Sequence, residues 1–398
     1  MRITTLLTTL LLTIAMASFA HASQLTAAFE SACERTPEII GLAARRPEID
    51  ARVGAADALL PGGPWTTVMH RTDALTNDRQ TREYEAEFGI PLWLRGERGA
   101  SLAAALTGGE RLEAEIAAKR LDVAKRVRDA YWMVAEAREK LAVAERRRAA
   151  AATLSQNQRS QAQAGQAQLL DSKLSEADLK DAEGALAALR SELNQAVIAF
   201  EVITGTEAPS SFRERDIGSA SPADHPRVVL RRVAIQKAEA DEGLTWAVDR
   251  ERPEISGFVN NTRDTFAEPV ITSLGVRLKI PFSYDAINQP KRAAAAADVV
   301  AAHEELLLAE REVGGDAAQA RARLEGARQQ LKALDERHAN LALVVQLTQD
   351  AQRAGQSNFS DLVRSRLQLF EADLARASAR VAVDRARSDL SQALGLEP

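Results

Sequence analysis

Residues 81–93 read Thr-Arg-Glu-Tyr-Glu-Ala-Glu-Phe-Gly-Ile-Pro-Leu-Trp, and their alternation decides the fold. Tyr84, Ala86, Phe88 and Ile90 fall on one side of the alternation, and glutamates at 83, 85 and 87 fall on the other. A period of two over this length predicts a β-strand with one apolar face and one wet face.

The same pattern returns at an offset of 190 residues, over 271–282. Leu274, Val276, Leu278 and Ile280 share one face, opposite the face that carries Arg277 and Lys279. Partner strands are expected over 65–71 and 254–261. Alternating segments of about 10 residues are typical of transmembrane β-strands. Taken singly, each strand also fits a half-buried strand of a soluble sheet.

The offset extends well beyond the strands. Residues 164–166 (Ala-Gly-Gln) recur at 354–356, Asp171 recurs as Asp361, and Gly-x-Glu at 205–207 recurs at 395–397. A constant offset over this distance indicates a tandem duplication. We expect a signal peptide over 1–22, a first copy over 23–210 and a second copy over 211–398. Each copy would contain a helix, two strands and a long helical hairpin.

Two segments without proline, 92–208 and 291–397, leave room for very long helices. We expect helices over about 94–164 and 287–354, each about 100 Å long. Apolar and small residues recur at steps of three and four, which is a coiled-coil period. These seam positions are 116, 123, 127, 130, 134, 137, 141 and 144 in the first helix, and 324, 327, 331, 334, 338, 341, 345 and 348 in the second. Gly165 and Gly355 would end these helices, and Ser357 or Ser360 is expected to cap the helix that follows.

Composition excludes several classes of protein. The 51 basic and 56 acidic residues give a net charge of −5, and no basic patch of the kind that nucleic-acid binding needs is visible. One cysteine, Cys33, excludes an internal disulfide. Arg2, the apolar run 6–17 and Ala20-His21-Ala22 have the pattern of an export signal.

Together, the duplication, the paired strands that end in Ile-Pro, the two Gly-x5-Asp turns and the closing Gly-x-Glu resemble the TolC-like outer-membrane efflux family. Residues 252–255 (Arg-Pro-Glu-Ile) look most like its heavy-metal (cobalt–zinc–cadmium type) branch. The resemblance implies a mainly α fold with a small β part. Coiled-coil hairpins would form a trimeric α-barrel, and each chain would add four strands to a shared 12-stranded outer-membrane β-barrel.

The resemblance also implies a function and partners. The chain would be the outer-membrane duct of a tripartite efflux system, with a long periplasmic extension. Its partners would be two further copies of itself, a periplasmic adaptor, an inner-membrane pump of the RND type and outer-membrane lipid.

Site residues follow from the turns and the strands. The resemblance places adaptor contact at Gly165, Gln166, Gly355 and Gln356, and a periplasmic gate at Asp171 and Asp361, with Arg364 in pairing reach of Asp361. The alternative for the two aspartates is that they only place a negative charge in the first turn of their helices, where it favours the helix dipole. The alternation itself predicts a lipid-facing surface formed by Phe88, Ile90, Leu274, Val276, Leu278 and Ile280.

No catalytic constellation, metal site or cofactor motif is recognisable. The four histidines outside the signal have no Cys or His neighbour at ligand spacing. Two other classes stay open from the sequence, a periplasmic coiled-coil adaptor and a structural coiled-coil protein. The alternating strands favour the duct over both.

Overall fold

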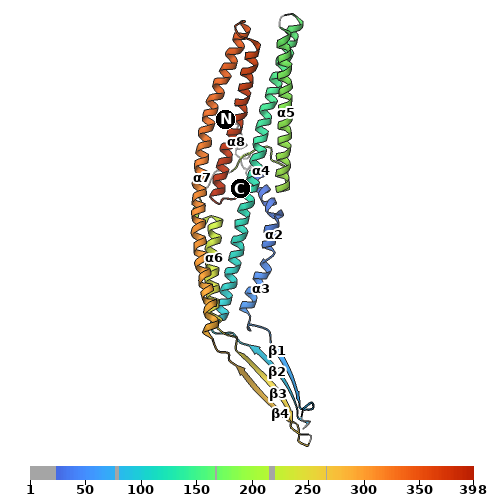
Figure 1. The fold of residues 1–398 in the computed structure, drawn as a ribbon, viewed down its shortest axis with the longest axis vertical. Helices are drawn as coiled ribbons and strands as arrows, with labels where there is room; N and C mark the ends of the chain where they lie inside the picture. Colours follow the sequence, from blue (N-terminus) through green and yellow to red (C-terminus); the bar gives the residue numbers. More distant parts are fainter. Residues whose placement is uncertain (1–23, 77–79, 166–167, 215–219, 266) are drawn as a thin grey trace, which may run out of the picture. The chain divides into compact units, whose positions relative to one another are not determined.

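The computed structural model describes residues 24–76, 80–165, 168–214, 220–265 and 267–398. The predicted signal peptide and Gln166 lie outside these ranges. A helix over 24–35 precedes a series of elements shown in Figure 1: α2 (Pro37–Ala43), α3 (Arg46–Asp57), β1 (Trp65–Thr72), β2 (Arg82–Pro91), α4 (Glu97–Gln163), α5 (Leu169–Thr204), η1 (Pro222–Asp224), α6 (Pro226–Ala247), β3 (Glu254–Arg263), β4 (Ile271–Lys279), α7 (Asp285–Arg353) and α8 (Phe359–Ala393). The expectation of a mainly helical chain with a small β part is confirmed.

The chain divides into two compact units. The helical unit comprises the described residues up to Ile40, Ala117–Pro226 and Glu310–Pro398. The sheet unit comprises Gly41–Ile116 and Arg227–Ala309. Each unit therefore contains residues from both predicted copies, and α4 and α7 contribute residues to both units.

The sheet unit contains one antiparallel sheet with strand order β1-β2-β3-β4 (Figure 1). Trp65 pairs with Gly89, Ile90 with Ile255, and Glu254 with Lys279. The central pair, β2 with β3, joins a strand of the first copy to a strand of the second. Side chains alternate between the two faces of each strand, and the strands pair in register. Most apolar side chains therefore lie on one face of the sheet, and most charged side chains lie on the other.

The helical unit contains two hairpins, α4 with α5 and α7 with α8. Its main core lies where α4 meets α5 and the helix over 24–35, and includes Phe29, Val127, Tyr131 and Phe200. Seven of the eight seam positions expected on α4 are buried, and Leu141 is half-buried. On α7, Leu324 is buried and the other expected seam positions are half-buried. Both long helices thus use the predicted coiled-coil stripe, and α7 is covered less completely.

The start of α8 differs from expectation. Asn358 occupies the position before α8, its side chain makes no cap hydrogen bond, and Ser360 lies inside the helix. The prediction of a serine cap is therefore wrong. The helix begins instead at Phe359, which packs into a small buried cluster with Leu154 and Leu362.

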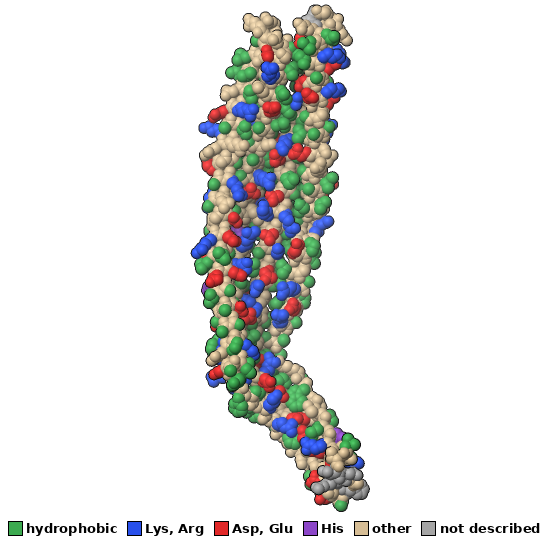
Figure 2. All heavy atoms as spheres, viewed as in Figure 1, with side chains coloured by type: hydrophobic (Ala, Val, Ile, Leu, Met, Phe, Trp, Pro, Cys, Tyr) green, Lys and Arg blue, Asp and Glu red, His purple; other side chains and the backbone are tan. Residues whose placement is uncertain are grey.

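Lys and Arg are interspersed with Asp and Glu over the visible surface of the helices (Figure 2). Many of these charges are paired along or between helices, for example Lys140 with Glu136 and Glu192. Among the described residues, no helix is both long enough and apolar enough to cross a membrane.

Candidate functional site

The sheet carries its apolar residues on an exposed face. Leu274, Val276 and Leu278 are 80%, 75% and 55% exposed. Phe88 and Ile280 are also exposed, and Ile90 is half-buried. The pairing register adds neighbours on the same face from the other strands: Val68, Tyr84, Ile255 and Val259, all at least partly exposed. An exposed apolar surface therefore runs across β2, β3 and β4, and on β1 it is continued by Val68, between Thr66 and His70.

Charged residues occupy the opposite face and are paired with each other. Glu87 is only 5% exposed, and it accepts hydrogen bonds from Ser256 Oγ and from the guanidinium of Arg277. The same Arg277 reaches Glu85, with an N–O distance of 3.2 Å. Because the charges are satisfied while the apolar residues are not covered, this sheet is inverted relative to the sheet of an ordinary soluble protein.

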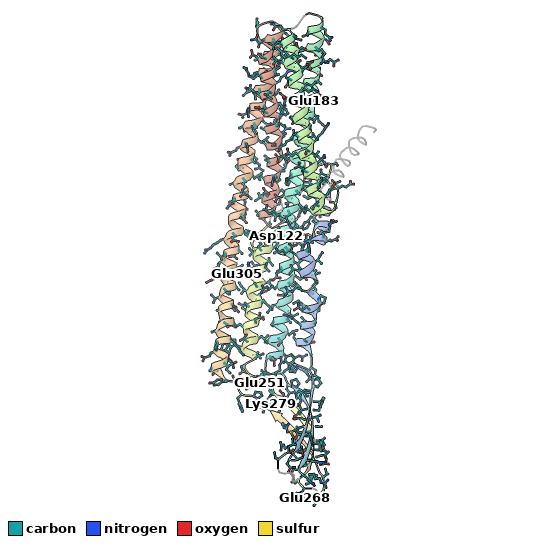
Figure 3. The ribbon with its side chains drawn as sticks, turned by 45° about the vertical axis from the view of Figure 1, so that its right-hand side comes forward. Asp122, Glu183, Glu251, Glu268, Lys279 and Glu305 are labelled. Atoms are coloured by element: carbon teal, nitrogen blue, oxygen red, sulfur yellow. The ribbon has the colours of Figure 1, made fainter. Side chains whose placement is uncertain are left out.

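Further ion pairs continue along this face. Arg71 pairs with Glu83 at 3.0 Å. Near the helix end of β4, Lys279 lies 3.3 Å from Glu254 and 3.5 Å from Glu251, and the latter pair is labelled in Figure 3. The sequence predicted a wet face here and placed Arg277 and Lys279 on it, but it did not predict which charges pair. The offset of 190 between Glu87 and Arg277 was a usable signal, because equivalent positions of the two copies carry opposite charges.

A second cluster that the sequence did not predict lies where strands meet helices in the sheet unit. Glu97 is fully buried and its carboxylate lies 2.7 Å from the Arg252 guanidinium. Glu97 also accepts the backbone N–H of Leu94, which fixes the first turn of α4. Arg252 in turn donates to the carbonyl of Pro61 and lies over the ring of Trp93. The Arg-Pro-Glu-Ile stretch thus joins β3 to the start of α4.

The hairpin turns of the helical unit have the geometry that the sequence predicted. Gly165 and Gly355 have φ of 70° and 71°, in the left-handed region. After α7, the Gly355 N–H donates to Gln352 and the Gln356 N–H donates to Ala351, which is a Schellman motif. No other atom lies within 4 Å of where a side chain at either glycine would begin, and Gln356 is exposed. These turns therefore present open backbone to the surroundings.

The predicted gate residues lie in the first turn of the next helix. Asp171 is in α5 and Asp361 in α8, and neither is at an N-cap position. Asp361 forms an ion pair with Arg364 at 3.6 Å, in which Arg364 is exposed and Asp361 is half-buried. No ion pair of Asp171 is found among the described residues. The Leu154, Phe359 and Leu362 cluster packs just beyond the turns and holds the two hairpins together.

Within the described ranges, no group of three or more His, Cys, Asp or Glu side chains is placed to hold a metal ion. His338, at a seam position of α7, instead forms a pair with Asp373 of α8 at 2.9 Å.

These features have counterparts in known proteins. The family model described as "Outer membrane efflux protein" matches residues 29–206 and again residues 217–396. The chain belongs to the outer membrane efflux protein family. This is a family of channel proteins and not of enzymes, so the adaptor and structural-protein alternatives are set aside.

A curated relative is the cobalt-zinc-cadmium resistance protein CzcC of Cupriavidus metallidurans, which is 25% identical over 271 residues. That alignment covers 63% of this chain and 64% of the relative, so the chain matches less than two thirds of the relative's length. Among solved structures, CusC has a TM-score of 0.74 at 16% identity, covering 94% of this chain and 92% of that one. The outer membrane protein VceC of Vibrio cholerae has a TM-score of 0.71 at 14% identity, covering 94% and 96%. At these identities the structural likeness shows the fold.

Proposed function

We propose that this chain is the outer-membrane duct of a tripartite efflux system and works as a homotrimer. Each subunit would contribute β1 to β4 to a shared 12-stranded barrel in the outer membrane. The α4/α5 and α7/α8 hairpins would extend into the periplasm as an α-barrel. Export would depend on a signal peptide over 1–22, and the copies 23–210 and 211–398 would be two similar halves of the barrel wall.

The inverted sheet carries this proposal. Four strands alone cannot close a barrel, and an exposed apolar face of this size is a liability in water. In a bilayer, the same face would meet hydrocarbon, and the paired charges would line the interior. Phe88, Ile90, Leu274, Val276, Leu278 and Ile280 would then be the lipid-facing residues.

The hairpin turns suit a contact with a periplasmic adaptor. Gly165 and Gly355, with Gln356 beside the second, offer exposed backbone that a partner helix can approach closely. We include Gln166 by its equivalence to Gln356, although it lies outside the described residues. An inner-membrane pump of the RND type would complete the system and would select the cargo. The CzcC relative makes cobalt, zinc or cadmium ions the first candidates.

Asp171, Asp361 and Arg364 would form a gate at the periplasmic end. Three copies would bring six carboxylates together, and such a cluster needs compensating positive charge. The observed Asp361–Arg364 pair supports this arrangement within one chain. In the competing role, the two aspartates only interact favourably with the partial positive charge at the N-terminal ends of their helices.

Membrane fractionation tests the proposal. We expect the protein in the outer membrane as a trimer that resists SDS at room temperature and dissociates on boiling. In a strain lacking its own metal efflux duct, expression with the cognate adaptor and pump should restore resistance to cobalt, zinc or cadmium. A monomer recovered in the soluble periplasmic fraction would overturn the proposal.

A further inference from the structure

We propose that Arg82 and Arg263, adjacent at one end of the apolar face of the sheet, bind the phosphate of a lipid headgroup in the outer leaflet of the outer membrane. This inference rests on the proposed function, in which β1 to β4 cross that membrane. The site would select one chemical class of lipid, whereas the rest of the apolar face would meet any hydrocarbon chain.

The apolar face of the sheet is arranged in rows that run across the strands, because the strands pair in register. Neighbouring rows are two residues apart along each strand, which is about 6.7 Å. The three rows nearest the start of α4 contain aliphatic, aromatic or small residues, with one threonine at the edge. In order, these rows are Ile90, Ile255 and Leu278; Thr66, Phe88, Gly257 and Val276; and Val68, Ala86, Val259 and Leu274. These three rows would contact the acyl chains of the membrane lipids.

The fourth row marks a change from apolar to polar side chains. It consists of His70, Tyr84, Asn261 and Thr272. The rings of His70 and Tyr84 stack with their centroids 4.3 Å apart, and the hydroxyl of Thr272 donates to Asn261 Oδ1 at 2.7 Å. Tyrosine is enriched where hydrocarbon gives way to headgroups, because its ring is apolar and its hydroxyl is polar. We therefore expect the boundary of the hydrocarbon at this row.

The fifth row carries positive charge. Thr72 pairs with Arg82, and Arg82 pairs with Arg263 across β2 and β3. Arg82 begins β2 and Arg263 ends β3, at the end of the sheet away from the start of α4 (Figure 1). Every residue of the four strands lies within the described ranges, and on their apolar face Arg82 and Arg263 are the only charged residues. The charge is thus confined to the level at which headgroups are expected.

Arg82 differs from the cations on the opposite face of the sheet. Each cation on that face has a carboxylate partner: Arg71 with Glu83, Arg277 with Glu87, and Lys279 with Glu254. Arg82 is exposed and pairs with no carboxylate in the described part of the chain. Like charges directly opposite each other in a sheet repel. The row of Arg82 and Arg263 therefore favours an anion from outside the chain.

Phosphate fits this row in charge and in shape. A guanidinium presents two parallel N–H groups to phosphate oxygens, and such contacts are shorter and stronger than neutral hydrogen bonds. Arg263 Nε donates to the carbonyl of Thr265 at 3.1 Å, which restrains the position of its guanidinium. The Thr72 hydroxyl accepts the N–H of Ala74 at 3.3 Å and keeps its own proton to donate. A phosphate between Arg82 and Arg263 would offset the repulsion between them.

A lipid fits this surface better than a free anion does. The phosphate of a lipid would lie at the fifth row while its acyl chains lie over the first three rows. Free phosphate would use only the arginines and would compete with water at an exposed site. In the proposed orientation this end of the sheet faces the exterior, so the lipid belongs to the outer leaflet. The proposed trimer would have one such site in each chain.

Lipid binding by the purified, delipidated trimer tests the site. The probe is lipid A, a phosphorylated glycolipid of the outer leaflet, and the reference is lipid A from which the phosphates have been removed. Native mass spectrometry in detergent should show one phosphorylated lipid A per chain, bound roughly tenfold or more tightly than the reference. Inorganic phosphate at the same concentration should not displace it.

The variant Arg82→Gln should weaken the binding of phosphorylated lipid A by about tenfold and leave the binding of the reference unchanged. Because Arg82 has a positive neighbour and no ion pair to lose, the delipidated variant trimer should dissociate at the same temperature as the unaltered trimer, or at a higher one. Arg71→Gln is the matched control, because Arg71 precedes Thr72 and lies on the opposite face. This control should bind lipid A as the unaltered protein does.

Equal binding of lipid A with and without its phosphates would overturn the site, and so would equal affinity in Arg82→Gln and the unaltered protein. Displacement of the lipid by inorganic phosphate would show a free-anion site instead. A delipidated Arg82→Gln trimer that dissociates at a lower temperature would show that Arg82 supports the fold. All three results require outer-membrane trimers and would leave the proposed function intact. Absence of any outer-membrane trimer would overturn both.

Discussion

At the scale of single residues, environment matters more than residue type. Leu278 and Arg277 are neighbours in β4, yet the leucine is exposed while the arginine bonds the buried carboxylate of Glu87. The alternation in the sequence predicted which residue lies on which face. It did not predict that the charged face would be internally neutralised, because cross-strand pairing depends on register, and register depends on the turns.

The phase of the strand can be tested at Leu278. An arginine in the middle of a lipid-facing surface costs about 2–4 kcal/mol, so Leu278→Arg should reduce the yield of SDS-resistant trimers. Ser273→Arg is the matched control, because Ser273 is exposed on the charged face. Equal loss in both variants, or loss only in the control, would mean that the apolar face does not meet lipid.

Asp389 of α8 predicts a pH dependence of stability. Burial raises the pKa of the Asp389 carboxyl and nearby Asp129 raises it further, against the lowering effect of Arg385, Lys125 and Arg323. The folded chain therefore binds this proton more tightly than the unfolded chain. The resulting stabilisation is present at pH below the unfolded pKa and is lost as the pH rises through the folded pKa.

The corresponding variant is Asp389→Asn. It should raise the melting temperature at pH 7.5, and the gain should shrink towards pH 4. Asp384→Asn, on the same helix but in an exposed ion pair with Arg387, should change little at either pH. A gain that is the same at both pH values would show that Asp389 acts through packing instead of through its charge.

At the scale of elements, the sequence was informative wherever a local rule governs. All four strands and both long helices begin and end within a few residues of expectation, since period and proline placement act locally. The glycines that end α4 and α7 were predicted for the same reason. Two of the features that escaped prediction are the start of α8 at Phe359 and the Glu97–Arg252 pair. Both depend on contacts between segments far apart in the chain, which no local pattern encodes.

Substitutions at Gly355 test the proposed adaptor contact separately from folding. A side chain there is strained by the left-handed φ, at about 1 kcal/mol, but meets no neighbouring atom. Gly355→Leu should therefore leave outer-membrane trimers in place while efflux is lost. Gly355→Ala carries the same backbone strain with little bulk and should retain most efflux. If the alanine variant loses as much efflux as the leucine variant, backbone strain and not adaptor contact explains the loss of efflux.

The Asp361–Arg364 pair allows a test of the proposed gate in planar bilayers. Asp361→Ala/Arg364→Ala should raise the open probability of single channels, and Asp361→Ala alone should weaken block by multivalent cations from the periplasmic side. Asp350→Ala/Arg353→Ala removes a similar exposed pair at the end of α7 and serves as the control. Unchanged conductance and block, accompanied by lower thermal stability, would mean that Asp361 acts only through its interaction with the helix dipole.

At the scale of the whole chain, the two predicted copies do not fold as two separate bodies. Both compact units draw residues from each copy. In the helical unit, Arg128 of α4 is 3% exposed at its side chain and bonds Glu214 at 2.6 Å. It also donates to Gln392 and to the carbonyl of Leu396, which belong to the second copy. One buried guanidinium thus connects the two copies.

Removing this connection should be costly. Arg128→Ala leaves the Glu214 carboxylate buried without its partner, and such losses cost about 3–5 kcal/mol. Arg128→Met/Glu214→Leu removes both charges and should be far less damaging. Chemical denaturation of the detergent-solubilised protein measures the difference. Equal destabilisation by the single and double changes would mean that the network matters only through its shape.

The ion pair between Glu87 and Arg277 has a consequence for the history of the chain. These residues occupy the same place in the two copies, and the face that they share needs one of each charge. A chain built from two first copies would oppose glutamate to glutamate, and one built from two second copies would oppose arginine to arginine. Neither half can now replace the other. An ancestral ring of six identical half-length subunits would have had true sixfold symmetry. In the proposed trimer the two copies carry opposite charges at this position, so the ring of strands has threefold and not sixfold symmetry.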